Sequence, residues 1–398
     1  MKKLILILLA AALCLGIAAC GSAAGNAEPD KETVHQIGVI VYNLGDEEVI
    51  GIREYLQGYI EKNLDMVRFV YSGAISTPEE EMAFIQNACD SGVEGFLSFR
   101  TFDLAAEVAL CEKNGAYYML ASGTVSDEEF AAVEDNPWFL GMFGPGMDAE
   151  YRVGADMAEH FETKYPGQRF FILSGGAGQG NQMHLQRTIG ILDVILGRPE
   201  VNFTGDVKKL AATEKITTYT CADLTVTICP GYVARDASAF NVAKYALSVG
   251  NYDAAMFVLP PMDLVDYAGE AEVGVVDSYN TRNFQLFADG RLQYLAGKYS
   301  SVVGPAVALM LNAVTGYAAD FRDNGKAIKV RQQLWVSCGA DDYNEKYALS
   351  NSATMNAYNI DDLSKVMRIF NPDATLAELV ALAEASSYED VMIRRGKE

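Results

Sequence analysis

The feature that most limits how this chain can fold is an alternation of short apolar runs with segments of helical spacing, which occurs twice along the sequence. In the first set, the strand-like runs are residues 36–42, 66–71, 95–99, 116–121 and 138–143. The second set follows a long helical segment at 147–165, and its runs are residues 169–174, 217–229, 254–259 and 272–277. Strands separated by crossover helices form parallel sheets. The sequence therefore predicts an α/β fold of two doubly wound parallel-sheet domains.

One helix start carries a strong local signal. Thr77 is followed by Pro78 and by the acidic residues Glu79 and Glu80, which is the order of a capping residue, a proline at the first helical position and acids in the first turn. Beyond residue 280, the expected elements are an apolar helix at 302–315, a strand at 327–336 and helices at 360–369 and 376–386.

The N-terminal segment is typical of export. Lys2 and Lys3 precede an uncharged apolar run, and small residues then lead to Cys20 in a pattern that resembles a bacterial lipobox. We expect residues 1–19 to be a lipoprotein signal peptide and Cys20 to be acylated. The run falls short of the roughly 20 apolar residues that a retained membrane span needs. Residues 20–35 are rich in small and polar side chains and read as a flexible tether.

The charge balance argues against nucleic acid as a partner. The chain has 31 basic and 53 acidic residues, for a formal net charge of −22. Phosphate backbones are bound by clustered Lys and Arg, and no such cluster stands out. The acidity is typical of a soluble protein outside the cell.

Cysteines and histidines offer no metal site or catalytic motif. The seven cysteines lack CxxC spacing, and the three histidines form no HExxH motif. Cys221 and Cys229 could close a hairpin disulfide. The glycine-rich run 175–180 fits neither the dinucleotide nor the Walker pattern, so we interpret it as a ligand loop. We expect no cofactor, no metal and no catalysis.

Two stretches resemble a known family. The run Asp289-Gly290-Arg291-Leu292-Gln293-Tyr294-Leu295-Ala296-Gly297-Lys298 and the run Val273-Gly274-Val275-Val276-Asp277-Ser278 are similar to segments of the type I periplasmic binding proteins, particularly the ribose and galactose branch. The resemblance implies two lobes joined by a hinge of three strands, with a ligand held in the cleft between them. The expected N-terminal lobe is residues 36–144 with 278–328, the C-terminal lobe 145–277 with 329–345, and a helical extension 346–398.

In open α/β sheets, ligands bind beyond the carboxyl ends of the strands. The first lobe then offers Tyr42, Asn43, Phe99, Arg100, Ser122 and Phe143. The second lobe offers Gln179, Asn181, Arg187, Asp263 and Asp277, with Lys298 from a crossing segment.

Two of these residues match family positions. The resemblance implies that Arg187, in Arg187-Thr188-Ile189-Gly190, donates to ligand hydroxyls, and that Asp277 accepts from them. The chain departs from the family where Asp46, Glu47 and Glu48 replace aromatic residues. A sugar is therefore the first expectation, and a nucleoside or an amino sugar remains open.

The resemblance implies an extracytoplasmic, membrane-anchored solute-binding protein that passes a small polar ligand to the permease of an ABC importer. We expect it to act as a monomer. The alternatives are a ligand-sensing receptor of the same fold for a membrane signalling protein, and a nucleoside-binding lipoprotein.

Overall fold

The computed structural model describes residues 33–165, 169–175, 181–230, 237–350 and 357–396. The chain from Glu32 onward forms one compact unit, separate from Met1–Lys31. Several predictions fall outside the described residues: the signal peptide, the acylation site Cys20, most of the tether and the ligand residue Gln179.

The first sheet is parallel throughout, in the order β12-β5-β4-β3-β1-β2. Its strands are β1 (His35–Ile40), β2 (Val67–Tyr71), β3 (Gly95–Ser98), β4 (Tyr117–Leu120), β5 (Phe139–Gly144) and β12 (Ile328–Arg331). Each of the first five lies within two residues of the run predicted from the sequence. Parallel strands of this kind need crossover helices on both faces.

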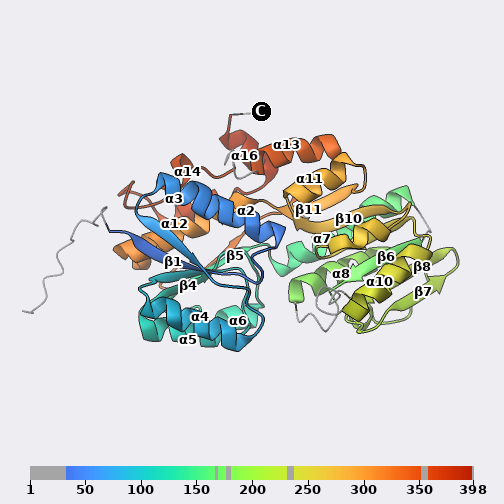
Figure 1. Ribbon diagram of the computed structural model, residues 1–398, viewed down its shortest axis with the longest axis horizontal. Helices are drawn as coiled ribbons and strands as arrows, with labels where there is room; N and C mark the ends of the chain where they lie inside the picture. The colour runs from blue at the N-terminus through green and yellow to red at the C-terminus, as the bar shows by residue number, and fades with distance from the viewer. Residues whose placement is uncertain (1–32, 166–168, 176–180, 231–236, 351–356, 397–398) are drawn as a thin grey trace, which may run out of the picture. The chain divides into compact units, whose positions relative to one another are not determined.

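Those helices form two layers (Figure 1). One face carries α4 (Pro78–Asp90), α5 (Leu104–Asn114) and α6 (Asp127–Ala131). The other carries α2 (Glu47–Tyr55), which continues as a π-helical turn (Leu56–Ile60) and α3 (Glu61–Asn63), together with α12 (Gly304–Asn312). Alternate residues of a strand face opposite layers. Ile40 of β1 packs in the core beneath α4, α5 and α6, whereas Val39 packs in the core beneath α2 and α12. The predicted start of α4 is confirmed, because Thr77 and Glu80 form a capping box.

The second sheet has the order β13-β11-β10-β9-β6-β8-β7. Its strands are β6 (Arg169–Ser174), β7 (Thr217–Cys221), β8 (Leu224–Pro230), β9 (Ala254–Phe257), β10 (Glu272–Ser278), β11 (Tyr294–Lys298) and β13 (Trp335–Ser337). Only the edge pairs β7·β8 and β11·β13 are antiparallel. The hairpin places Cys221 opposite Leu224 and far from Cys229. Both cysteines are free, so the disulfide considered from the sequence does not form.

Helices α7 (Met147–Lys164) and α8 (Gln182–Leu196) pack tightly on each other, because glycines on both helices allow their backbones to touch. A Cβ on Gly154 would lie 1.9 Å from the carbonyl oxygen of Arg187, and one on Gly190 would lie 2.1 Å from that of Tyr151. The remaining helices of this lobe are α9 (Val207–Ala211), α10 (Ala237–Val249), a 3₁₀ turn (Met262–Tyr267) and α11 (Thr281–Ala288).

The division of the chain between the two sheets differs from the predicted boundaries. Residues 278–328 were expected in the first lobe, yet β11 pairs in parallel with β10 in the second sheet. The β10–α11–β11 unit is short and keeps its two strands adjacent in one sheet. The single strand expected at 327–336 is two strands, because β12 pairs with β5 in the first sheet and β13 pairs with β11 in the second.

After β13 the chain forms α13 (Ala340–Ser350), which packs on α11 of the second lobe, and the C-terminal extension then folds as α14 (Ile360–Ser364), α15 (Leu376–Glu384) and α16 (Tyr388–Arg394). Helix α16 was not anticipated. Among the described residues, only Ser300–Phe321 is long and apolar enough to cross a membrane by composition, and 67% of its most apolar window is buried inside the fold. This burial is typical of a core helix, and α12 lies within the segment.

Candidate ligand-binding site

The strand ends of the two sheets meet where the chain passes between the lobes. The chain passes from β5 in the first sheet to α7, which packs with the second, and from β11 in the second sheet back to α12. It crosses a third time between β12 and β13. Three crossings are what the family resemblance implied, and they place the last residues of β10 and β11 close to the first lobe.

Lys298 ends β11 and connects the two lobes. Its Nζ donates to the carbonyl oxygen of Ser122 at 3.3 Å and lies 3.4 Å from Oε1 of Glu48. Ser122 follows β4 of the first sheet, and Glu48 lies in the first turn of α2. Because only 15% of the Lys298 side chain is exposed, the ammonium group is held between fixed acceptors.

An acidic group lies next to Lys298. The Tyr42 hydroxyl donates to Oδ1 of Asp46 at 3.0 Å and lies 3.5 Å from Oε2 of Glu48. Asp46 also caps α2 by accepting from the backbone N–H of Glu48. Burial, and secondarily the neighbouring Glu48, raises the pKa of Asp46. The negative charge of these side chains is therefore concentrated at the N-terminus of α2, which favours anions.

Asp277 extends this acidic group from the second lobe. It lies near the end of β10, where Nδ2 of Asn283 donates to Oδ2 at 2.8 Å. Burial raises the pKa of Asp277 to about 7 against the effect of that hydrogen bond, and the charges of Asp46 and Glu48 add to the rise. A carboxyl group with this pKa can both donate and accept hydrogen bonds near neutral pH.

Arg187, predicted to contact the ligand, is engaged by protein groups. Its Nε donates to Oε2 of Glu150 at 2.5 Å, and its Nη1 donates to the carbonyl oxygen of Val258 at 2.9 Å. Both side chains of this ion pair are buried. The other oxygen of Glu150 is buried without a protein partner, so the pair keeps one acceptor that a ligand or water can satisfy.

His184, in the first turn of α8, lies within electrostatic reach of Arg187 and Lys298. Burial, reinforced by these two cations, lowers the pKa of His184 to about 3. The imidazole is therefore neutral at physiological pH. Its Nδ1 is buried without a protein partner.

The other predicted residues have different surroundings. Phe99 and Phe143 are core residues, and Oδ1 of Asn43 accepts from Gly45 in a surface turn. Arg100 donates to the carbonyl oxygen of Ile75 at 2.6 Å and stacks on Phe102.

The last two lie in the second lobe. Asn181 caps α8 by accepting from the backbone N–H groups of Met183 and His184. Asp263 lies on the 3₁₀ turn, where it pairs with Arg282 and is 70% exposed.

The structure thus brings together Tyr42, Ser122, Asp277 and Lys298, with Arg187 connected through His184. The sequence analysis did not select Asp46, Glu48, Glu150 or His184. Asp46 and Glu48 carried a signal, because they lie at the start of α2 after β1, where the family resemblance implied aromatic residues. Glu150 carried none, because its partner is 37 residues away and only the close packing of α7 on α8 reveals the pair.

Two small pockets adjoin this group. The first has a volume of about 10 Å³ and is lined by residues that include Glu48, Lys298 and Tyr299. The second has a volume of about 50 Å³ and is lined by residues that include Glu47 and Tyr347. The first has room for about one water molecule. Neither accommodates a monosaccharide, so a ligand of that size requires the surrounding groups to separate.

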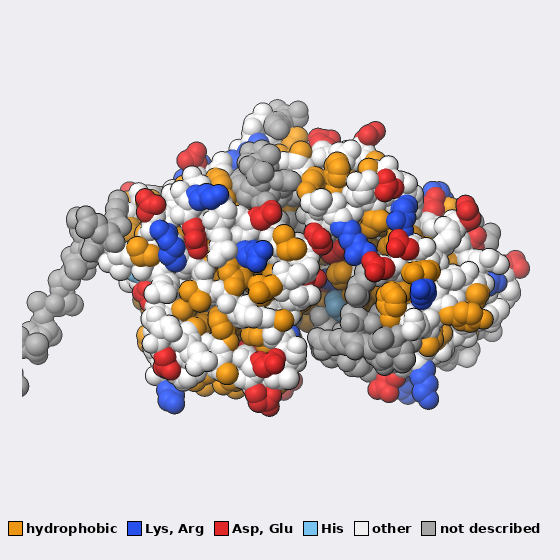
Figure 2. Space-filling view, in the orientation of Figure 1, with side chains coloured by type: hydrophobic (Ala, Val, Ile, Leu, Met, Phe, Trp, Pro, Cys, Tyr) orange, Lys and Arg blue, Asp and Glu red, His pale blue; other side chains and the backbone are white. Residues whose placement is uncertain are grey.

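The described residues contain no group of three or more His, Cys, Asp or Glu side chains able to hold a metal ion. Figure 2 shows Lys and Arg side chains interspersed with Asp and Glu over the visible face. A nucleic-acid interface would instead present a continuous basic stripe.

Comparison with family models gives no match, and comparison with curated protein sequences gives none either. Solved structures do match. An ABC transporter solute-binding protein from Bacillus halodurans with bound myo-inositol superposes with a TM-score of 0.56 at 16% identity, covering 81% of this chain and 99% of its own.

The arabinose-binding component of an ABC transporter from Shewanella gives a TM-score of 0.56 at 12% identity, covering 80% of this chain and 97% of its own. A solute-binding protein from Actinobacillus succinogenes with bound D-allose gives a TM-score of 0.57 at 14% identity, covering 78% of this chain and 99% of its own. At these identities the likeness establishes the fold. The chain has the two-lobed α/β fold of the type I periplasmic binding proteins, as found in sugar-binding components of ABC transporters.

Proposed function

We propose that this protein is an extracytoplasmic solute-binding protein, anchored through Cys20, that captures a small polyhydroxylated ligand between its lobes and delivers it to an ABC importer. The observation that carries the proposal is the convergence of Tyr42, Asp277 and Lys298 at the strand ends of both sheets. Ligands of open α/β sheets bind at such edges. The solved structures of the same fold hold sugars or inositol.

The chemistry of the group suits hydroxyl recognition. A sugar hydroxyl donates one hydrogen bond and accepts others, so a site needs fixed donors beside fixed acceptors. Lys298 supplies the donor, while Asp277 and Glu48 supply acceptors. The neutral imidazole of His184 and the free oxygen of Glu150 add two buried groups that lack protein partners. A ligand that satisfied them would recover the free energy lost when they were buried.

Ligand entry would require movement about the three crossings. The pocket beside Lys298 and the pocket beside Glu47 are both smaller than a sugar. Hinge closure around a ligand is the usual behaviour of two lobes joined in this way. The contacts of Lys298 with Ser122 and Glu48 would then be exchanged for contacts with ligand hydroxyls.

The test is a thermal-shift screen of the soluble form that begins at Gly21, against monosaccharides, inositols, nucleosides, amino sugars and polyamines. This form retains the compact unit that starts at Glu32. A ligand at a hundred times its Kd adds about 2.7 kcal/mol to the free energy of unfolding. Asp277→Asn should abolish the shift. Asp266→Asn is the matched control, because Asp266 is exposed and pairs with Arg291 on the surface.

A shift with one chemical class that Asp277→Asn removes and Asp266→Asn retains supports the proposal. A shift that both variants retain places the ligand elsewhere. If no class produces a shift, the capture of a small polar solute is contradicted, and presentation of a surface to a membrane signalling protein becomes the better account.

The anchor and the partner need separate tests. Cys20→Ala should abolish incorporation of a labelled fatty acid and release the protein from the membrane fraction. Retention of the label in that variant would contradict acylation at Cys20. Uptake of the identified ligand should be lost when this protein is deleted, whereas loss of a transcriptional response with uptake intact would favour the sensory role. Light scattering should give the mass of a monomer.

A further inference from the structure

The C-terminal extension contacts two of the three crossing segments through a single residue. The carbonyl oxygen of Ser386 accepts from the Tyr299 hydroxyl at 2.9 Å and from Nε1 of Trp335 at 2.9 Å. The Ser386 hydroxyl oxygen accepts from the backbone N–H of Gln333 at 2.8 Å. Tyr299 directly follows β11, Gln333 lies between β12 and β13, and Trp335 is the first residue of β13. One residue of the extension therefore joins two connections between the lobes.

Aromatic packing reinforces these hydrogen bonds. The rings of Tyr299 and Trp335 stack with centroids 4.0 Å apart, and Tyr388 of α16 meets Trp335 edge-on at 5.5 Å. Tyr358 also stacks with Tyr299, with ring centroids 6.3 Å apart. Three of these four side chains are nearly fully buried. Aromatic pairs of this geometry contribute beyond the area they bury, so ring contacts add to the hydrogen bonds that hold the crossing segments.

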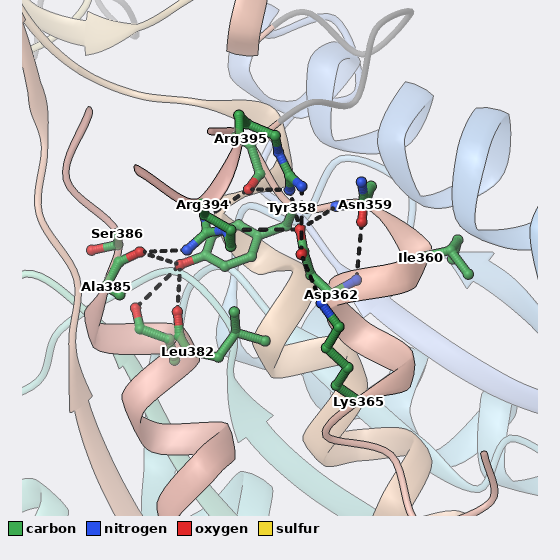
Figure 3. A network of polar contacts seen from close by, with 12 residues as sticks. Tyr358, Asn359, Ile360, Asp362, Lys365, Leu382, Ala385, Ser386, Arg394 and Arg395 are labelled. Carbon is green, nitrogen blue, oxygen red and sulfur yellow. Dashed lines mark hydrogen bonds and ion pairs between the residues drawn. The ribbon is translucent and has the colours of Figure 1, made fainter. Parts of the chain in front are cut away.

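The extension is itself firmly attached to the body of the protein. Figure 3 shows the buried carboxylate of Asp362 in the centre of a network with Arg394 and Arg395, beside the ring of Tyr358. The carbonyl oxygen of Tyr358 accepts from the hydroxyl of Tyr55 in α2 at 2.9 Å. These contacts fasten the start of residues 357–396 to the first lobe and the two ends of the segment to each other.

A further contact reaches the second lobe. The Tyr388 hydroxyl donates to Oε1 of Glu345 in α13 at 2.6 Å. Helix α13 packs on α11 of the second lobe, where the Tyr343 hydroxyl donates to the carbonyl oxygen of Asn280 at 2.9 Å. The extension therefore contacts both lobes as well as the segments that join them.

The crossing after β11 connects this contact to the candidate site. Lys298 and Tyr299 are neighbours in extended backbone, so their side chains point in opposite directions. Lys298 contacts Ser122 and Glu48 on one side, and Tyr299 contacts Ser386 on the other. Any displacement of Tyr299 changes the position of the Lys298 ammonium group.

We propose that residues 357–396 form a strap that holds the second and third crossings through Ser386, and that Tyr299 and Trp335 are positioning residues which fix Lys298 at the ligand site. Through the Ser386 contacts with Tyr299, Gln333 and Trp335, the strap acts on the hinge between the two lobes.

The experiment uses the soluble form that begins at Gly21, without any ligand. The double variant Tyr299→Phe/Trp335→Phe removes both donors to the Ser386 carbonyl and keeps aromatic rings in place. Tyr118→Phe is the matched control, because the Tyr118 hydroxyl is buried and donates to Oε2 of Glu107 at 2.7 Å within the first lobe. Both variants lose buried hydrogen bonds and keep aromatic rings, and only the double variant loses bonds at the crossings.

Two readouts separate positioning from general destabilisation. The first is the acetylation rate of Lys298 by an amine-reactive ester, measured by peptide mass spectrometry relative to Lys209, whose side chain is 86% exposed. The second is amide hydrogen exchange of residues 294–300 and 332–337. Two lost hydrogen bonds should accelerate both rates at least tenfold in the double variant, and Tyr118→Phe should leave both rates unchanged.

Equal rates at Lys298 in the double variant, the control and the parent would overturn the proposal. So would acceleration of equal size in the double variant and the control, because that would indicate loss of stability alone. If the double variant folds poorly, Tyr299→Phe alone carries the test with the same readouts. Since no ligand takes part, the outcome is independent of whether the proposed sugar-binding function holds.

Discussion

The ammonium group of Lys298 lies 3.4 Å from the carboxylate of Glu48, which joins the last residue of β11 in the second lobe to the first turn of α2 in the first. The contact pairs a largely buried positive charge with a negative one, so polar groups of the two lobes can pack closely at the candidate site. It also makes Lys298 the residue whose removal should affect ligand capture most directly.

We expect Lys298→Met to abolish the ligand-induced rise in melting temperature, since it keeps an unbranched side chain and removes the donor. The unliganded protein should change little in stability, because the lost ion pair is partly offset by relief of the cost of desolvating the ammonium group. Differential scanning calorimetry with and without ligand measures both. A variant that kept the full ligand-induced shift would remove Lys298 from the site.

The buried pair of Arg187 and Glu150 should be strongly coupled. Glu150→Gln leaves the Arg187 charge buried without its counter-ion, and breaking such a pair costs about 3–5 kcal/mol. The double variant Arg187→Met/Glu150→Leu removes both charges and should cost less than Glu150→Gln alone. Urea unfolding of the parent, Arg187→Met, Glu150→Leu and the double variant gives the coupling energy. Additive costs would show that the two charges do not depend on each other.

Asp277 should make the unliganded protein less stable as the pH rises. Its pKa is about 7 in the folded protein against 3.8 for an unperturbed aspartate. The folded state therefore retains a proton that the unfolded chain releases, so this contribution is full below about pH 3.8 and lost as the pH passes 7. Asp277→Asn should flatten the dependence between these limits. Parallel profiles for parent and variant, measured by denaturant unfolding, would contradict the shifted pKa.

Glu81, a buried carboxyl group in the first lobe, should make the protein less stable as the pH rises for the same reason as Asp277. It is fully buried, and burial, with the neighbouring Glu107 second, raises its pKa from 4.5 to about 8. Its contribution to the free energy of unfolding should fall as the pH rises from about 4.5 to 8. Glu81→Gln should remove that slope and leave ligand binding unchanged. A steeper slope in the variant would show that the carboxyl group is ionised when folded.

His184 should have the opposite effect on stability, because it should make the protein less stable as the pH falls. Its pKa is about 3 in the folded protein against 6.5 for an unperturbed histidine. The unfolded chain takes up a proton that the folded state excludes, so stability from the neutral imidazole is full above about pH 6.5 and falls towards pH 3. His184→Gln should reduce the acid sensitivity of the protein over this interval. An unchanged midpoint of acid unfolding, followed by circular dichroism, would argue against a buried neutral imidazole.

The alternation of strands and helices was predictable because each strand of a parallel sheet is an apolar run with its own crossover helix. The start of α4 was predictable because a capping box is local in sequence. The sheets to which β11 and β12 belong were not predictable from the sequence. Sheet membership depends on which sheet edge each strand meets after the chain crosses between the lobes. Sequence spacing carries no information on that choice.

The candidate site was predictable only in part. Tyr42 follows β1, and Asp277 and Lys298 lie at the ends of β10 and β11, so the rule that ligands bind at strand ends selects all three. The same rule selects Phe143, which is buried in the core, and Asp263, which is paired on the surface. Strand ends alone do not reveal the direction of a side chain. The contacts of Ser386 with Tyr299 and Trp335 join residues 51 or more positions apart, so no local sequence pattern predicts them.

The most direct test of the account is isothermal titration calorimetry with the ligand that the screen selects. We predict saturable binding of one ligand per chain, lost in Asp277→Asn and in Lys298→Met and retained in Asp266→Asn. Binding that survives in both site variants, or a stoichiometry unrelated to one per chain, would contradict capture of a ligand between the two lobes.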